Sequence, residues 1–300
     1  MSSILISIPY IGIAGVGIDL EFPEMAKESE APGKSLQRGF AVLRALAEAG
    51  GEGAKLIRVA EATGLTQATV HRLLQALQAE GMVEQDGRSR LYRLGIEFFA
   101  LAARAGNPGN LRDLCRPVLQ RLSAMLGDTV FLLVRSGFDA LCLDRCEGPF
   151  PIRSFTGDIG GRVPLGVGQG ALVILAFLPE AEREEVIRFN VPRLIGQSFM
   201  MDEVYLRTEM AKVRDTGFAA RRDFVFPGMG GVAVPILDRD GRAVAALSIG
   251  TISERLGEDR LPTVVEILKR EAAAIGPRLN PFDPALRRPA QLLGSASRGG

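Results

Sequence analysis

The chain has 300 residues, of which 47% are hydrophobic and 24% are charged, and its formal net charge at pH 7 is +1. This length indicates about two domains, and the composition is that of an ordinary globular protein. Three cysteines and a single histidine argue against a disulfide framework, a histidine-rich metal site and a histidine-dependent hydrolase. We therefore expect a reducing, cytoplasmic location and no metal or other cofactor.

Neither end of the chain is expected to belong to a folded domain. Residues 4–20 are apolar, but no basic residue precedes them and Asp19 interrupts them, which fits neither a signal peptide nor a membrane span. Residues 1–33 are interpreted as a disordered or mis-assigned extension, with Met25 as an alternative start. Residues 279–300 lack periodicity and are predicted to form a disordered tail.

Residues 34–95 contain the helical patterns of a DNA-binding unit. A first amphipathic helix is expected to be capped by Ser35 and to end near Gly50. Its expected apolar positions are Phe40, Leu43, Leu46 and Ala47. Two further helical patterns meet at Gly64, which supplies a tight turn, and Thr66 occupies the N-cap position of the second.

The second of these helices has one apolar face and one polar face. Its apolar residues recur at i, i+3, i+4 and i+7 and predict a buried stripe: Val70, Leu73, Leu74 and Leu77. The opposite face presents small and polar residues suited to a DNA major groove: Ala68, Arg72, Gln75 and Ala79, flanked by Thr69 and His71. The pattern predicts a helix-turn-helix, whose alternative is an ordinary helical hairpin with a solvated face.

Strand patterns at residues 82–85 and 91–94 flank Asp86-Gly87, a sequence typical of a β-hairpin turn. Such a hairpin after the recognition helix is a wing, and its basic tip can reach phosphates. Residues 34–95 contain nine Lys/Arg and six Asp/Glu, whereas the remainder of the chain is slightly acidic. We predict that this winged helix-turn-helix contacts double-stranded DNA through Thr66, Gln67, Thr69, His71, Arg72, Gln75, Arg88 and Arg90.

The rest of the chain predicts a linker helix (residues 96–108) and a second domain (residues 109–278) of α+β class. Helices are expected at residues 111–126, 169–178, 181–189, 202–215 and 261–275. The first of them has the apolar positions Leu114, Val118, Leu122 and Met125. Strands are expected at residues 129–135, 140–146, 151–155, 232–237 and 243–249. Hairpins separated by helices favour a sensor-type α+β domain over a doubly wound sheet.

Three features of this domain have both a chemical and a structural interpretation. Cys142 and Cys146 are expected on one side of a strand, as core residues or as a metal pair. The glycine-rich stretch 166–170 is either a turn or an anion-binding helix start. Arg221 and Arg222 are either solvated or partners of a ligand carboxylate. No residues in the sequence form a recognisable nucleophile–base pair.

Several segments together resemble the IclR family of bacterial transcription regulators. They are SLQRGFAVLRAL, AEATGLTQATVHRLLQALQAEGMVEQ, the wing, RVPLGVGQGALVILA and GRAVAALSIG. The resemblance covers residues 35–275 and implies a GAF-like C-terminal domain that binds a small metabolite, often a carboxylate. It also implies a homodimer or tetramer that binds palindromic operators.

The resemblance further implies where the effector binds: Gly160, Gly161, Arg221, Gly231, Ser248 and Gly250. Gly231 and Gly250 stand where some members have Cys or Ser, and smaller residues there are expected to admit a bulkier effector. Arg221, where some members have an acidic residue, or Arg222 would then bind its anion. The histidine common after Pro-Leu is Gly166 here, so no role for that imidazole is carried over.

The sequence thus favours a ligand-responsive DNA-binding regulator, of a catabolic operon, that senses a small organic acid and requires no membrane. An enzyme that uses the C-terminal domain, with DNA binding secondary, is the alternative. A dimeric DNA-binding protein without a sensing function is a third.

Overall fold

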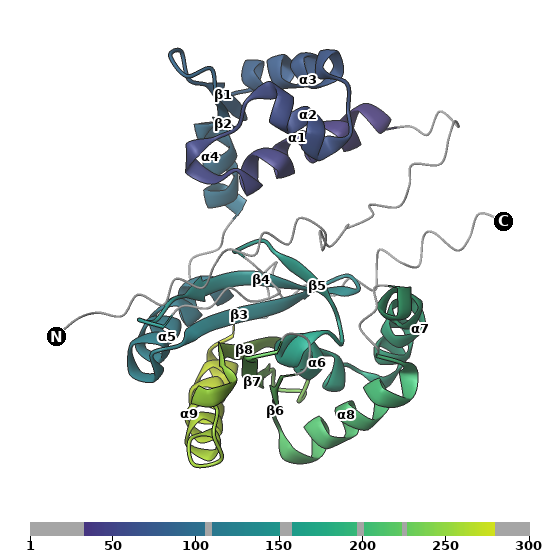
Figure 1. Cartoon of the computed structure of the whole chain (residues 1–300), viewed down its shortest axis with the longest axis vertical. Helices are drawn as coiled ribbons and strands as arrows, with labels where there is room; N and C mark the ends of the chain where they lie inside the picture. Colours follow the sequence, from purple (N-terminus) through teal and green to yellow (C-terminus); the bar gives the residue numbers. More distant parts are fainter. Residues whose placement is uncertain (1–32, 106–109, 151–157, 197–200, 224–226, 280–300) are drawn as a thin grey trace. The chain divides into compact units, whose positions relative to one another are not determined.

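The computed structural model describes residues 33–105, 110–150, 158–196, 201–223 and 227–279. The chain divides into two compact units, Met1–Ala105 and Gly106–Gly300, which are considered separately (Figure 1). No helix in the described ranges is both long enough and apolar enough to cross a membrane.

The first unit consists of helices and one short hairpin. Its helices are α1 (Lys34–Glu48), η1 (Gly50–Glu52), α2 (Leu56–Thr63), α3 (Gln67–Ala79) and α4 (Ile96–Ala105). The strands β1 (Val83–Gln85) and β2 (Tyr92–Leu94) form the antiparallel hairpin predicted as a wing. A core common to α1, α2, α3 and the hairpin contains Val42, Leu46, Val59, Ala60, Val70, Leu74, Val83 and Tyr92.

Helix α1 differs from its prediction in its start and in its buried face. It begins at Lys34 with Gly33 as N-cap and no side-chain capping bond, so Ser35 lies inside the first turn. Val42 and Leu46 are the buried residues, whereas the side chain of Phe40 is 51% exposed. The i, i+4 pair of Val42 and Leu46 therefore defines the face that packs on α2 and α3, and Phe40 projects from another face.

The second unit is built on a six-stranded antiparallel sheet with the strand order β5-β4-β3-β8-β7-β6. Its strands are β3 (Thr129–Ser136), β4 (Asp139–Cys146), β5 (Arg162–Pro164), β6 (Ala219–Arg222), β7 (Met229–Leu237) and β8 (Ala243–Ile252). Strand β6 was not predicted, because Ala-Ala-Arg-Arg has no apolar alternation. The predicted strand at residues 151–155 lies outside the described residues.

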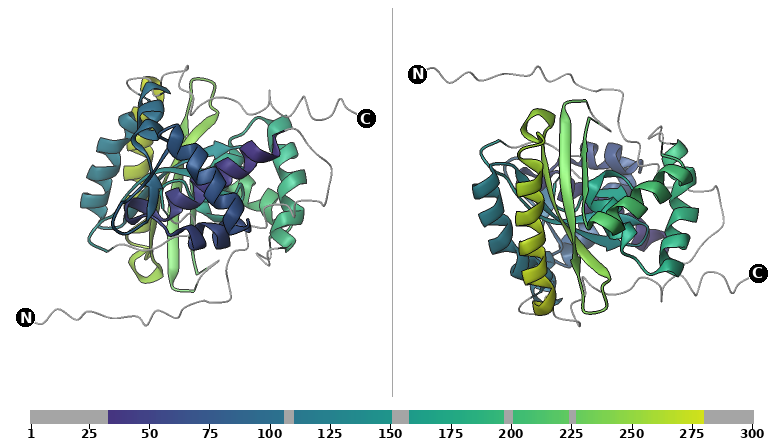
Figure 2. Two further views of the ribbon diagram at one scale, coloured as in Figure 1. Left: turned by 90° about the horizontal axis from the view of Figure 1, so that it is seen from above. Right: turned by 90° about the horizontal axis from the view of Figure 1, so that it is seen from below.

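Helices cover both faces of this sheet (Figure 2). The helices are α5 (Leu111–Leu126), α6 (Gly168–Ala176), α7 (Glu180–Gly196), α8 (Glu203–Thr216) and α9 (Leu261–Ile275), with η2 (Ser253–Arg255) and η3 (Gly276–Arg278). Helices α5 and α9 share one apolar core with the sheet, and α6, α7 and α8 share the other. This arrangement confirms the expected α+β class, and we call the second surface the α6 face of the sheet.

Helix α5 has the predicted bounds, and the predicted apolar residues Val118 and Leu122 are buried, with Leu114 partly buried against the same core. Leu111, Cys115, Leu119 and Leu126 are buried along it, whereas Met125 is 56% exposed. Asn110 caps the helix by accepting a hydrogen bond from the backbone N–H of Asp113. Helix α7 is longer than predicted and continues through Pro192 to Gly196.

Cys142 and Cys146 lie on opposite faces of the sheet, which corrects the prediction of a shared side. Cys142 belongs to the core on the α6 face, while Cys146 packs against the α5 side and accepts a hydrogen bond from Ser123. The register with β3 shifts at Leu143, so that Leu132 pairs with Asp144 and Leu133 with Cys142. This bulge adds one residue and reverses the alternation beyond it.

Candidate functional sites

Helix α3 is held at its start by its predicted cap. The Thr66 hydroxyl accepts a hydrogen bond from the backbone N–H of Thr69, and the two threonine hydroxyl oxygens lie 2.9 Å apart. Gly64 ends α2 in the left-handed conformation with φ +66°, as a tight turn between the helices requires. The helix-turn-helix is therefore defined by local hydrogen bonds and by the buried side chains of Val70 and Leu74.

The outer face of α3 leaves most of the predicted DNA-contacting side chains exposed. Those exposed are Thr66, Gln67, His71, Arg72 and Gln75, and Ala68 lies among them. Thr69 is half-buried, and its hydroxyl is already bonded to Thr66. The face thus presents the guanidinium of Arg72, the imidazole of His71 and two glutamine amides, all suited to base edges or phosphates.

The tip of the wing is the loop between β1 and β2, residues 86–91, and Asp86 orders it. The Asp86 carboxylate accepts hydrogen bonds from the backbone N–H groups of Arg88 and Ser89 and from the Ser89 hydroxyl. These bonds, first of all the one from the Ser89 backbone, lower the pKa of the Asp86 carboxyl. The hairpin predicted from Asp86-Gly87 is confirmed, and Arg90 adopts a left-handed backbone with φ +60° in its loop. Arg88 and Arg90 are both exposed at its tip.

In the second unit, cross-strand pairing brings the predicted effector residues onto one face. Arg221 pairs with Gly231, Gly231 with Gly250, and Gly250 with Thr129. In the next row Ser248 pairs with Ala233 and with Phe131, which belong to the core on the α6 face. Directly paired residues point to the same face, so these predicted residues share the α6 face.

The Gly160-Gly161 turn lies beside β4. The backbone N–H of Cys142 donates to the Gly161 carbonyl at 2.9 Å, and that of Gly160 donates to the Cys142 carbonyl at 2.8 Å. The Gly161 N–H donates to the Asp158 carbonyl. Both amide groups are therefore bonded within the protein, whereas a Cβ at Gly160 would meet nothing within 4 Å. This turn can offer close approach to a ligand.

The guanidinium of Arg221 is bound by helix α8. It donates to the Tyr205 hydroxyl, lies 5.1 Å from the centroid of the Tyr205 ring, and is 3.5 Å from a Glu209 carboxylate oxygen. Burial raises the pKa of Tyr205 to about 12, although the positive charge of Arg221 acts to lower it. This phenol is therefore neutral near pH 7. Arg221 is half-buried and Arg222 is exposed.

The space expected at Gly231 is filled by Gln169, a residue not singled out from the sequence. A Cβ on Gly231 would lie 2.9 Å from Gln169 Oε1 and 2.9 Å from the Ile249 carbonyl oxygen. The glycine therefore permits α6 to approach the sheet and does not provide extra room for a ligand. Gly170 has the same role, since a Cβ there would lie 2.3 Å from Leu133.

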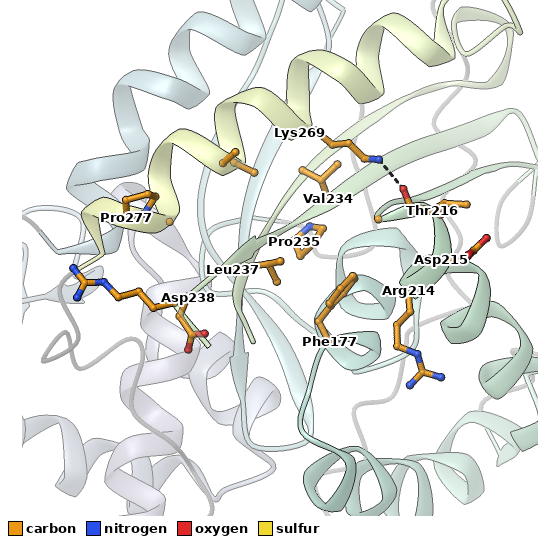
Figure 3. Close-up of a pocket in the computed structure, with 15 residues that line it drawn as sticks. Phe177, Arg214, Asp215, Thr216, Val234, Pro235, Leu237, Asp238, Lys269 and Pro277 are labelled. Atoms are coloured by element: carbon orange, nitrogen blue, oxygen red, sulfur yellow. Dashed lines mark hydrogen bonds between the residues drawn. The ribbon is translucent and has the colours of Figure 1, made fainter. Parts of the chain in front are cut away.

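Two hollows in this unit contain few of the predicted effector residues. A cavity of about 180 Å³ between α6, α8 and β6 is lined by Gln169, Tyr205 and Arg221, and Arg221 is its single predicted effector residue. A more open groove of about 600 Å³ lies between the end of α8, β7 and α9 and contains none of the six (Figure 3). There Lys269 Nζ donates to the Thr216 carbonyl at 2.6 Å.

Cys115 and Cys142 are buried and have the properties of core residues. Burial raises the pKa of both Cys115 and Cys142 to about 12, so these thiols are protonated near pH 7. Among the residues that the structure describes, no three or more His, Cys, Asp or Glu side chains are grouped to hold a metal ion.

Comparison with known proteins identifies both units. Residues 35–87 match the IclR helix-turn-helix domain, and residues 106–276 match the C-terminal domain of the bacterial transcriptional regulator IclR. The chain belongs to the IclR family. The expected winged helix-turn-helix and C-terminal α/β domain are thereby confirmed for this IclR-family regulator.

Relatives of this IclR-family chain are transcriptional regulators. The regulator KipR of Bacillus subtilis is 29% identical over 217 residues, which are 72% of this chain and 86% of KipR. The repressor AllR of Escherichia coli is 27% identical over 246 residues, covering 82% of this chain and 90% of AllR.

Solved IclR structures have the same fold. The IclR protein of Thermotoga maritima superimposes with a TM-score of 0.62 at 25% identity, covering 82% of this chain and 98% of that one. An IclR homologue from Microbacterium hydrocarbonoxydans, solved with 4-hydroxybenzoate, gives 0.68 at 25% identity with the same coverage of both chains.

Proposed function

We propose that this IclR-family regulator places α3 in the DNA major groove and controls a catabolic operon in response to a small organic acid. The observation that supports this role most strongly is the exposed face of α3, where Gln67, His71, Arg72 and Gln75 have no structural task in the described hydrogen bonds. Thr66 and Thr69 then contribute by fixing the first turn of α3 at the DNA surface.

The wing supplies sequence-independent binding in this proposal. Arg88 and Arg90 extend from a loop that Asp86 already orders, so less conformational entropy is lost when they contact phosphates. Their contribution is expected to weaken with salt, while contacts from Arg72 are expected to depend on the base pair.

The C-terminal unit is proposed to be the sensor. Support comes from the relative solved with 4-hydroxybenzoate and from the small, alanine- and glycine-rich α6 face around Ser248 and Gly250. The single histidine, His71, lies in the other unit, and two of the three cysteines have thiols protonated near pH 7. These features favour a binding domain over an enzyme.

We further propose that the protein acts as a homodimer or tetramer. Large apolar side chains are exposed on the first unit at Leu36, Phe40, Ile96 and Leu101. A two-fold assembly would cover such residues and match a palindromic operator with half-sites one helical turn apart.

The decisive experiment is a fluorescence anisotropy titration with the intergenic DNA upstream of the gene, with a scrambled duplex as competitor. Specific binding by the full chain that is weakened in Arg72→Ala, and unchanged in Arg121→Ala, supports the proposal. Arg121 is a suitable control because it lies in the second unit, where it forms an ion pair with Glu271. Equal affinity for operator and scrambled DNA at moderate salt would refute it.

A further inference from the structure

Helix α6 covers the strand rows that carry the predicted effector residues. A Cβ on Gly170 would lie 3.4 Å from the Ser248 Cβ, and one on Gly231 would lie 2.9 Å from Gln169 Oε1. Open space lies next to these contacts, in the cavity of about 180 Å³ between α6, α8 and β6, which we call the α8 cavity. This volume is that of about six water molecules, which is enough for a small organic molecule.

Small residues leave the α8 cavity open. Gly168 lines it with φ +73°, and a Cβ at this position would meet nothing within 4 Å. Ala219 and Ala220 of β6 line it with methyl groups alone. Because a backbone with this φ disfavours any residue with a side chain, the space at Gly168 stays unfilled.

Helix α8 turns a polar face toward the cavity. The residues of this face recur at i, i+4, i+7 and i+11 and line the cavity: Tyr205, Glu209, Lys212 and Thr216. The adjacent face, with Leu206 and Met210, is buried in the core on the α6 face. The polar face of a helix ordinarily borders solvent, so its position against a hollow indicates that the hollow holds polar contents.

The α8 cavity has an excess of positive charge. The Glu209 carboxylate bridges two cations, with Oε1 2.7 Å from Lys212 Nζ and Oε2 3.5 Å from Arg221 Nη1. Tyr205 is neutral near pH 7 because burial raises its pKa to about 12. The ionised side chains that line the cavity are therefore two cations and one carboxylate. A monoanion would balance them, and such a positive cleft attracts anions.

Two side chains from different helices have hydrogen-bonding capacity left for a ligand. The side-chain amide of Gln169 lines the cavity and has no hydrogen-bond partner among the described residues. The Lys212 ammonium has three N–H groups, of which one donates to Glu209 Oε1 at 2.7 Å. No second acceptor for Lys212 is present in the described part of the chain. A charged donor on α8 and an amide on α6 thus border the same hollow.

We propose that the α8 cavity binds the acid that this regulator senses, and that the acid is a small carboxylate with a hydroxyl group. This inference rests on the proposed sensor function and names the site and the chemistry of its ligand. Lys212 donates to the carboxylate, and Gln169 bonds to the hydroxyl. Arg221 stays bonded to Tyr205 and contributes its positive charge. The ligand links α6 to α8, so its binding stabilises the folded second unit.

The test is calorimetry on the full chain with glycolate, lactate and 3-hydroxybutyrate. Each is measured beside its amide, which lacks the charge, and beside acetate, propionate or butyrate, which lack the hydroxyl. We expect at least one hydroxy acid to bind more tightly than both of its analogues and to raise the Tm in a thermal shift assay.

Two variants test the two contacts separately. Lys212→Gln is expected to weaken that hydroxy acid about 10-fold and to leave its amide unchanged, because a charge-assisted hydrogen bond is lost. Gln169→Met is expected to weaken the hydroxy acid about 3- to 10-fold and to leave the acid without a hydroxyl unchanged. Arg207→Gln is the matched control, since it removes the same charge from α8 but its guanidinium pairs with Glu184 and Glu203. We expect this control to bind the acid as the wild type does.

The inference is overturned if no hydroxy acid is preferred to its amide, or if Lys212→Gln and Arg207→Gln bind the acid equally. Loss of binding in Ser248→Val, with normal binding in Gln169→Met and Lys212→Gln, would overturn it and leave the sensor function standing. Lys212 is exposed, so its variant is expected to fold, and the wild-type comparison of acid with amide needs no variant. Operator binding by the wild-type chain without any acid reports on the DNA-binding role independently.

Discussion

The hydroxyl oxygens of Thr66 and Thr69 lie 2.9 Å apart at the start of α3, and Thr66 also accepts the backbone N–H of Thr69. Thr66→Ala removes this cap, and we expect it to destabilise the helix by about 1 kcal/mol. Hydrogen exchange of the α3 amides should become correspondingly faster, while Thr66→Ser should keep most of the protection. Equal exchange in Thr66→Ala and wild type would show that packing alone holds the helix start.

The wing should lose order at low pH. Because the folded-state pKa of Asp86 is depressed, its stabilisation of the loop is present above the unfolded-state pKa and is lost as the pH falls through the folded-state value. NMR of the Ser89 amide should report this as a chemical-shift change with an apparent pKa below that of an ordinary aspartate. A titration at or above the ordinary value would contradict the hydrogen bonds described.

The salt dependence of operator binding should separate the wing from α3. Replacing Arg88 and Arg90 together with alanine should reduce the slope of log affinity against log salt by about 2, with sequence preference retained. Arg72→Ala should instead relax the preference at one base-pair position. An unchanged slope in the double variant would remove the wing from the phosphate-binding surface.

Asp128 should be a major determinant of the stability of the second unit. It is fully buried, and its carboxylate binds Arg255 at 3.0 Å, Arg260 at 2.6 Å and the Thr251 hydroxyl at 2.8 Å. Asp128→Ala leaves two arginines without this counterion, and we expect a loss of about 3 kcal/mol in the free energy of unfolding. Chemical denaturation measures it, and Arg121→Ala, which removes a guanidinium that is 55% exposed, is expected to cost about 1 kcal/mol or less.

Gly231 should tolerate no side chain because Gln169 and the Ile249 carbonyl approach it. Gly231→Ala is expected to destabilise the unit by about 1–3 kcal/mol. Gln169→Ala should recover part of this loss, since a flexible side chain gives way while the backbone carbonyl does not. A double-mutant cycle by denaturation checks the coupling, and strict additivity would show that the two residues do not touch.

Local periodicity explains which elements could be predicted. The bounds of α5 and α9 follow from apolar spacing and capping residues within a few turns, and the β1–β2 and β3–β4 hairpins follow from their turn sequences. Strand β6 could not be predicted, because it exists through pairing with β7 and not through its own side chains. The buried face of α5 was misjudged at Met125 because periodicity alone leaves the phase of a wide apolar stripe open.

The sequence by itself determined a winged helix-turn-helix joined to an α+β domain, since caps, turns and apolar spacing act over a few residues. It also indicated the exposed face of α3, because one helix fixes which residues oppose the buried stripe. Only the tertiary structure decided which side chains of the second unit share the α6 face of the sheet and what binds them. One bulge turns Arg145 to the α6 face, and Tyr205 and Glu209 of α8 bind Arg221 of β6. Such choices depend on contacts between residues far apart in the chain.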